Sequence, residues 1–230
     1  MADAAPEGNS MKTLTIQNST IDETEIRNYD LLEEIILLPE ETFNENEAKQ
    51  MIKRIGKIHP FILQRLVQTR VQLKLFTGSL TDQPEFEHLK GITPRGYTED
   101  GPTWDDVPGI GGTRLVLAKI GNSNKGEGHG SVNLELHELA HSVDRIAFDF
   151  IRDDSTFLGI WYQEAQNQFP NQPYFLNYPE EYFAESFAMY YLNEDTRNEL
   201  KEKSPLTFEF LTNLEQIENN NLIVSIVSYH

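Results

Sequence analysis

Strand-like and helix-like patterns occupy different halves of this chain, and that separation constrains its fold more than any other feature. Residues 71–76 alternate apolar and polar side chains, which is typical of a half-buried strand, and residues 114–120 form a second strand candidate. From residue 133 onward the pattern is mainly helical, with helices expected over 133–152, 156–168, 179–192 and 205–218. The sequence therefore predicts an α+β fold with a small N-terminal twisted sheet and a mainly helical C-terminal half.

The N-terminal half also contains two helix signals. Asn44 is placed to cap a helix, with Glu47 at the capping-box position, and apolar residues then recur on one helical face. Pro60 interrupts this pattern, and a second helix is expected after it, through Val67. The apolar segment 31–38 fits either a buried strand or a short helix, and its periodicity does not distinguish between them.

The length of 230 residues is enough for one domain with a well-buried core. Residues 1–29 are polar and aperiodic, so we expect a flexible lead-in there. One functional domain is expected over 30–218, with a sheet-containing half at 30–132 and a helical half at 133–218. Residues 219–230 form a C-terminal tail, for which a short edge strand and a disordered end both remain open.

Charge and composition narrow the candidate partners. With 19 Lys and Arg residues against 37 Asp and Glu residues, the net charge is −18, which disfavours nucleic acids and anionic membrane surfaces as partners. No apolar run approaches the roughly 20 residues of a transmembrane helix, so membrane insertion is not expected. No signal peptide is visible at residues 1–10, and the absence of cysteine excludes disulfides and a cysteine nucleophile. We expect a monomer.

The strongest chemical signal is His137-Glu-Leu-Ala-His141, which matches the pattern His-Glu-x-x-His. Positions i and i+4 lie on one face of a helix, so both imidazoles can reach a single Zn²⁺ ion at about 2.0–2.1 Å each. Glu138 lies beside the first ligand, where a carboxylate can accept a proton from an attacking water. An exposed turn with two unrelated histidines is the alternative, but the flanking apolar residues indicate burial, and buried histidines need partners. We therefore predict one zinc ion per chain, with Glu138 as general base.

A catalytic zinc site has three protein ligands and one open position, so a third ligand is needed. The helix expected from Pro179 carries Glu181 and Glu185 at positions i and i+4, on one face. In the gluzincin class of peptidases, the first acid binds the metal and the second supports a ligand histidine. We therefore favour Glu181 as the third ligand, with Glu185 as the competing candidate. The metzincin pattern fails, because Asp144 and Ala147 stand where that pattern has Gly and His.

Hydrolysis of an amide also requires a donor for the oxyanion besides the metal. Tyr174 and Tyr178 both lie just before the second helix, and the sequence alone does not choose between them. Residues 91–112, which are dense in Gly and Pro, predict a long loop, and loops of this length inside a compact domain are often functional.

Three segments of the chain resemble the secreted Pro-Pro endopeptidases, which are relatives of the catalytic domain of anthrax lethal factor: residues 101–112, 133–144 and 178–187. The similarity extends from about Leu31 to Leu214. It implies the metal ligands and the general base favoured above, and it places the oxyanion tyrosine on Tyr174. It also implies a secreted enzyme that cleaves between two prolines in exported, Pro-rich proteins.

The resemblance implies substrate contacts in the long loop. In the family, an aromatic residue of this loop packs on a substrate proline, and Tyr97 stands where a Trp can occur. A basic residue of the same stretch pairs with the first glutamate of the second helix. Here these two residues are Arg95 and Glu180.

The strand at 113–120, entered through Gly111 and Gly112, is expected to be a sheet edge that pairs with an extended substrate. Proline has no N–H group and a fixed φ, so a protease for such a substrate must use shape, aromatic packing and the flanking N–H groups. An ordinary sheet edge without substrate is the alternative. Trp104 either anchors the loop or contacts the substrate, and we favour the anchor.

Two alternative functions use the same residues. A host-directed protease like lethal factor would keep the chemistry and change the target, but we expect no separate delivery domain here. A zinc-stabilised module would bind Pro-rich segments without cleaving them, and the intact Glu138 argues against this. The leading hypothesis is a zinc metalloendopeptidase that acts on Pro-Pro bonds.

Overall fold

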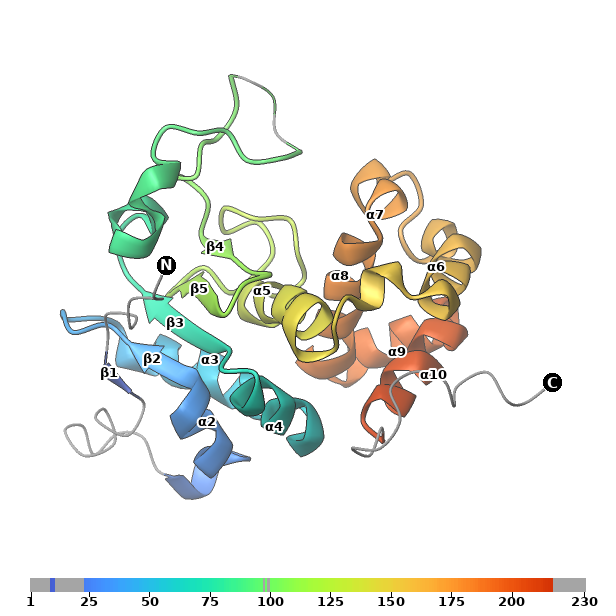
Figure 1. The fold of residues 1–230 in the computed structure, drawn as a ribbon, viewed down its shortest axis with the longest axis horizontal. Coiled ribbons are helices and arrows are strands. Elements are labelled where there is room, and N and C mark those ends of the chain that lie inside the picture. Colours follow the sequence, from blue (N-terminus) through green and yellow to red (C-terminus); the bar gives the residue numbers. More distant parts are fainter. Residues whose placement is uncertain (1–8, 11–22, 97, 99, 217–230) are drawn as a thin grey trace.

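The structure is a computed structural model, and it describes residues 9–10, 23–96, 98 and 100–216. Figure 1 shows the sheet and the first helices on one side, the later helices on the other, and α5 between them. The helices are α2 (Tyr29–Ile35), α3 (Glu45–Ile55), α4 (Pro60–Gln68), α5 (Leu134–Ser142), α6 (Ser155–Gln168), α7 (Pro173–Asn177), α8 (Pro179–Leu192), α9 (Glu194–Lys203) and α10 (Pro205–Leu214). This arrangement confirms the predicted α+β class.

The described strands form one sheet in the order β1-β2-β3-β5-β4. They are β1 (Asn9–Ser10), β2 (Ile36–Leu38), β3 (Gln72–Phe76), β4 (Gly109–Ile110) and β5 (Leu115–Lys119). β3 runs parallel to β2 and β5, while β4 pairs antiparallel with β5 through Leu117 and Ala118. The prediction that the strand at 113–120 is a sheet edge is therefore wrong. The end of the long loop folds back as β4 and becomes the edge, and two residues are too few to show a strand pattern in the sequence.

The central strand β3 is buried on both faces, and the predicted half-buried alternation is wrong for it. Lys74, expected to face solvent, is only 4% exposed, and its Nζ lies 3.7 Å from Oε2 of Glu85. Strands of parallel pairs are normally covered on both faces, because the connections between them carry chain over the sheet. Lys74 is therefore a polar residue within a buried strand, and it does not mark a solvent-exposed face.

The N-terminal helices follow the sequence closely. Oδ1 of Asn44 accepts a hydrogen bond from the backbone N of Glu47 at 3.2 Å, which confirms the predicted cap. Pro60 begins α4, as its fixed φ allows at a first helical position. Both readings of segment 31–38 are partly right, because α2 ends at Ile35 and β2 begins at the next residue.

The C-terminal helices differ from the prediction in four places. The helix expected over 133–152 ends earlier, since α5 passes into a π-helical turn at Val143–Ala147 and the chain then reverses through Asp149 and Phe150, both with positive φ. Two helices were missed, α7 next to Pro173 and α9 between α8 and α10. The last helix ends at Leu214, four residues before the predicted boundary at residue 218.

One large apolar core joins the two halves, because it contains residues of β3, α5 and α8. Ile26, within the predicted lead-in, is 5% exposed and belongs to this core, while the tail at 219–230 lies outside the described residues. A smaller cluster beneath the long loop consists of Phe76, Leu80, Phe86 and Leu117.

The described helices include none that is long and apolar enough to cross a membrane. Short 3₁₀ helices complete the fold at Glu23–Glu25, Leu80–Asp82, Pro84–Leu89 and Ile151–Asp153.

Candidate functional site

Two helices bring three candidate metal ligands together. α5 supplies His137 and His141, one turn apart, and α8 supplies Glu181. The Nε2 atoms of the histidines are 3.2 Å apart, and each lies 3.4 Å from Oε2 of Glu181. A tetrahedral ion bound at 2.0–2.1 Å holds its ligand atoms roughly 3.3–3.4 Å apart, so the triangle has the size of one face of such a site.

The donor chemistry also fits a metal ion. Oε2 of Glu181 is buried and has no hydrogen-bond partner within the part of the chain that the structure describes, although a buried carboxylate oxygen normally requires one. Two imidazoles and one carboxylate form a ligand set found in catalytic zinc sites. Among the described residues, His137, His141 and Glu181 are the group of acidic and histidine side chains arranged to hold an ion. This group could therefore bind a metal.

Glu185, the competing candidate for the third ligand, lies behind His137. Its Oε2 is 3.0 Å from Nδ1 of His137, and its Oε1 accepts a hydrogen bond from the backbone N of Val132 at 2.8 Å. Nδ1 of His137 therefore donates to Glu185, and Nε2 faces the other two ligand atoms. Of the two acids one turn apart on α8, Glu181 lies with the Nε2 atoms and Glu185 orients an imidazole.

The three ligand groups interact strongly without a metal. Burial lowers the pKa of His137, but its contacts with Glu181 and Glu185 outweigh this and raise that pKa to about 10. Burial raises the pKa of Glu181, and the two histidines reverse this effect and hold it far below its usual range. A proton and a metal ion thus compete for the same lone pairs in this group.

Glu138 follows His137 on α5 and does not belong to the ligand triangle. Burial raises the pKa of its carboxyl group, and the two neighbouring histidines counteract part of that effect. The edge strand β4 covers this position, because a Cβ atom at Gly109 would lie only 2.8 Å from Cγ of Glu138. Glu138 is therefore a confined carboxyl group beside the candidate metal position.

The long loop reaches across to α8 through Arg95. Its Nη2 lies 2.8 Å from Oε1 of Glu180 and 3.2 Å from Oε1 of Glu181, and the guanidinium group stacks over the ring of Tyr178 at 4.4 Å. The contact with Glu180 is the pair expected from the sequence. The contact with Glu181 joins the same loop to a candidate metal ligand.

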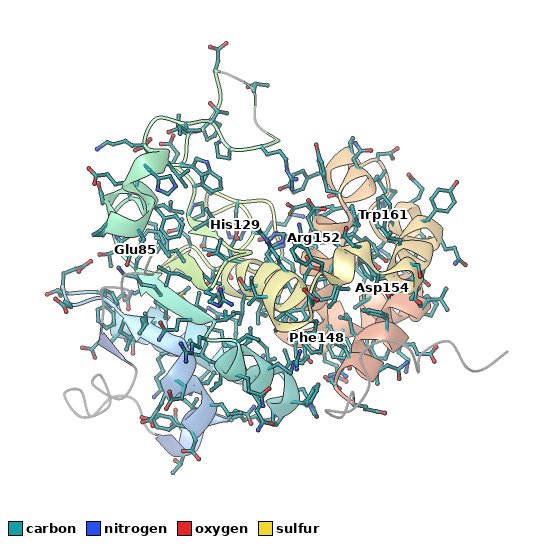
Figure 2. All side chains as sticks on the ribbon, in the orientation of Figure 1. Glu85, His129, Phe148, Arg152, Asp154 and Trp161 are labelled. Atoms are coloured by element: carbon teal, nitrogen blue, oxygen red, sulfur yellow. The ribbon has the colours of Figure 1, made fainter. Side chains whose placement is uncertain are left out.

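A second cation near Glu180 was missed in the sequence. Nη1 of Arg152 lies 3.7 Å from Oε1 of Glu180, and buried Asp144 accepts hydrogen bonds from the backbone N and Nε of Arg152 at 2.8 and 2.5 Å. Figure 2 shows Arg152 near the centre of the molecule, close to α5. No local pattern marks this residue, because its role depends on the reversal of the chain after α5.

The two candidate tyrosines lie side by side, with ring centroids 5.7 Å apart. Burial and the negative charge of Glu181 both raise the pKa of Tyr174, so its hydroxyl stays protonated. Tyr174 is nevertheless 39% exposed, and a Cβ at Gly96 would lie 3.1 Å from its ring. Tyr178 lies under Arg95 instead, so Tyr174 is the tyrosine that combines an exposed ring with an interaction at Glu181.

Three further residues were expected to bind the substrate or to anchor the loop. Trp104 packs beneath the loop, whereas Gly111 and Gly112 lie against α5. Trp104 is half-buried against the cluster beneath the loop, and its backbone N donates to O of Ile92 at 2.9 Å. The backbone N of Gly112 donates to Oγ of Ser142, and a Cβ at Gly111 would lie 2.0 Å from the backbone O of Glu138. Tyr97 lies outside the described residues.

Comparison with known proteins gives consistent results. The family model for anthrax toxin lethal factor, N- and C-terminal domain, matches residues 20–214. A Pro-Pro endopeptidase of Clostridioides difficile is 45% identical over 188 residues, covering 82% of this chain and 84% of the relative. A Pro-Pro endopeptidase of Paenibacillus alvei is 41% identical over 184 residues, with coverage of 80% and 84%. The solved structure of the Paenibacillus alvei enzyme matches with a TM-score of 0.76, covering 80% of this chain and 99% of that one.

The fold and the site define a peptidase of the His-Glu-x-x-His class, with a glutamate from a later helix completing the ligand group. The chain belongs to the anthrax lethal factor family, on the branch that contains the Pro-Pro endopeptidases.

Proposed function

We propose that this protein is a zinc metalloendopeptidase that hydrolyses the peptide bond between two prolines. The observation that carries the proposal is the triangle of His137, His141 and Glu181 with Glu138 beside it, in a chain 45% identical to a Pro-Pro endopeptidase. Zinc is the proposed metal, because two imidazoles and a carboxylate suit a catalytic zinc site that keeps one open position. When bound, zinc would polarise the scissile carbonyl and make water a better nucleophile.

In this proposal Glu138 transfers the protons. Its carboxylate accepts a proton from the water that adds to the carbonyl carbon, and it returns that proton to the proline nitrogen when the C–N bond breaks. The raised pKa of this half-buried carboxyl group suits the first step, because it makes the carboxylate a stronger base. Protonation of the nitrogen matters here, since the leaving group is a secondary amine.

Tyr174 is proposed as the donor to the oxyanion. Its pKa is raised by burial and by Glu181, so the hydroxyl is protonated across the physiological range and can donate. The alternative, Tyr178, carries the guanidinium of Arg95 on its ring face, which fits a role in holding the loop.

We propose that the long loop and the edge strand hold the substrate. Arg95 joins the loop to Glu180 across the site, and Tyr97 of the same loop is assigned to a substrate proline. The edge segment, which consists of β4 and the two glycines after it (residues 109–112), lies against α5 beside Glu138. An extended peptide next to this segment would therefore pass the base. Trp104 is assigned to the loop anchor, which its packing against the smaller apolar cluster supports.

The test uses the protein loaded with one equivalent of zinc and a peptide with Pro-Pro at its centre. Matched control peptides replace either proline with alanine. We expect cleavage only between the two prolines, loss of cleavage with a chelator, and recovery when zinc is restored. Cleavage at another bond, or equal cleavage of the alanine peptides, would contradict the proposed specificity. Peptide binding without fragments would indicate a binding module instead.

Export and a monomeric state are also part of the proposal. Both are expectations of the sequence, the first from the family resemblance. Mass spectrometry of the culture medium of the source organism tests export, and we expect the protein in the medium. Light scattering of the zinc-loaded chain tests the monomeric state, and we expect the mass of one chain. Retention inside the cells or a dimeric mass would contradict these two points and leave the chemistry untouched.

A further inference from the structure

Two glycines of the edge segment, Gly109 and Gly111, lie directly against α5, the helix that carries Glu138. A Cβ atom added to Gly109 would lie 2.8 Å from Cγ of Glu138 and 2.9 Å from Cδ1 of Leu134. A Cβ atom added to Gly111 would lie 2.0 Å from the backbone O of Glu138. Neither glycine has a positive φ, so the shortage of space, and not the backbone conformation, accounts for glycine at these positions.

The alternation of a strand explains why both glycines face the helix. Successive side chains of a strand point to opposite faces, so Gly109 and Ile110 of β4 take opposite faces, and Gly111, just past the end of β4, meets the helix again. Ile110 packs against the apolar cluster beneath the loop, which leaves Gly109 and Gly111 toward α5. Leu134 and Glu138 are one helical turn apart, and Gly109 lies over both of them.

The two glycines contact different parts of Glu138. Gly111 meets its backbone, so any side chain at 111 would separate the edge segment from the helix. Gly109 meets its side chain, at the carbon that directs the carboxylate. The third neighbour of a Cβ at Gly109 is the backbone O of Leu117 at 3.1 Å, and this atom belongs to β5, which is fixed by pairing with β3 and β4. The groups free to move are therefore the side chains of Glu138 and Leu134.

We infer that Gly109 is a positioning residue for Glu138. The missing side chain leaves room for Cγ of Glu138 between α5 and the edge strand. This inference rests on the proposed function, in which Glu138 is the general base. A methyl group at 109 displaces the carboxylate and leaves the ligand atoms of His137, His141 and Glu181 in place.

The test compares Gly109→Ala with the control Gly159→Ala. Gly159 lies on α6 without a positive φ, and among the described residues no atom beyond its chain neighbours and the nearby backbone of α6 lies within 4 Å of an added Cβ. We expect kcat of G109A to fall by about 100-fold, the loss typical of a reacting group displaced by roughly 1 Å. KM and zinc content should stay within twofold of the parent chain, and G159A should match the parent in all three. A normal kcat in folded G109A, or a parallel loss of zinc, would overturn the inference.

A second measurement does not depend on turnover. Glu138→Ala removes the carbon that Gly109→Ala would contact, so the two substitutions should be coupled in thermal stability. We expect G109A to lower the Tm of the zinc-loaded chain by several degrees, and to lower it by less than half as much in the E138A background. If G109A does not fold alone, recovery of folding in the double variant supports the contact, and continued failure overturns it. A parent chain without peptidase activity would instead count against the proposed function, while this cycle still tests the contact.

Discussion

Nδ1 of His137 lies 3.0 Å from Oε2 of Glu185, and the other oxygen of Glu185 accepts a hydrogen bond from the backbone N of Val132. The carboxylate is therefore fixed from one side by the loop before α5 and orients the imidazole from the other. This contact sets which nitrogen of His137 carries the proton and which faces the ligand group.

Replacing Glu185 with glutamine should weaken metal binding without removing it. The amide keeps the shape but loses the charge that favours the Nδ1–H···O contact, so zinc affinity should fall by about 10- to 100-fold. Competition with a coloured chelator measures this. Glu199→Gln, at an exposed acid paired with Lys203, is the matched control and should bind zinc like the parent. Equal affinity in E185Q would show that His137 is oriented by other contacts.

Glu138→Ala should abolish turnover while zinc stays bound. The carboxyl group is not part of the ligand triangle, so its removal leaves the metal site intact but removes the proposed base. We expect kcat to fall by about 10²–10⁴-fold, the usual contribution of a positioned acid–base group, which leaves turnover close to background. Single-turnover kinetics and metal analysis on the same sample check this. Normal turnover with zinc bound would exclude Glu138 as the base.

Tyr174→Phe and Tyr178→Phe separate the two candidate oxyanion donors. The rings are neighbours of the same type, so each variant is the control for the other. We expect Y174F to lose about 10²–10³-fold in kcat, as is typical when one oxyanion donor is removed, and Y178F to stay within a few-fold. Steady-state kinetics on the Pro-Pro peptide give the comparison. The reverse order would assign the donor role to Tyr178.

Much of the site was visible in the sequence, because the candidate metal ligands and the acid that orients one of them come in pairs at helical spacing. His137 with His141 and Glu181 with Glu185 each lie one turn apart, and an α-helix fixes such pairs on one face without any tertiary information. The pairing of Arg95 with Glu180 could be expected only through the family resemblance, since 85 residues separate them.

The unpredicted parts of the structure depend on contacts between distant segments. β4 is two residues long, and it exists only because the loop folds back on β5. The end of the helical region after α5 is set by Asp144, whose backbone O accepts from N of Phe150 and whose side chain binds Arg152. The burial of Lys74 likewise comes with a contact to a separate segment, at Glu85, which an alternating pattern does not reveal.

Zinc binding should release about one proton per ion at about pH 8. The pKa of His137 is raised to about 10 in the metal-free chain, so the group still holds its extra proton there, and zinc must displace it. Calorimetry in buffers of different ionisation enthalpy measures the release. Because the folded pKa exceeds the ordinary value of 6.5, the metal-free chain should lose this part of its stability as pH rises through 10, while zinc affinity increases. Zinc affinity that does not change between about pH 7 and pH 9 would contradict this assignment.

Asp144→Ala should strongly destabilise the chain. Asp144 has no exposed surface, and its carboxylate holds the backbone N and guanidinium group of Arg152, whose side chain is 22% exposed. Removing one partner of a buried pair leaves an uncompensated charge, which costs about 3–5 kcal/mol of the free energy of unfolding. The exposed pair of Glu199 and Lys203 is the control, because Glu199→Ala should cost at most about 1 kcal/mol. Urea unfolding of the zinc-loaded variants measures both. A loss below about 1 kcal/mol for D144A would mean that Arg152 finds another acceptor, such as Glu180, whose Oε1 lies 3.7 Å from its Nη1.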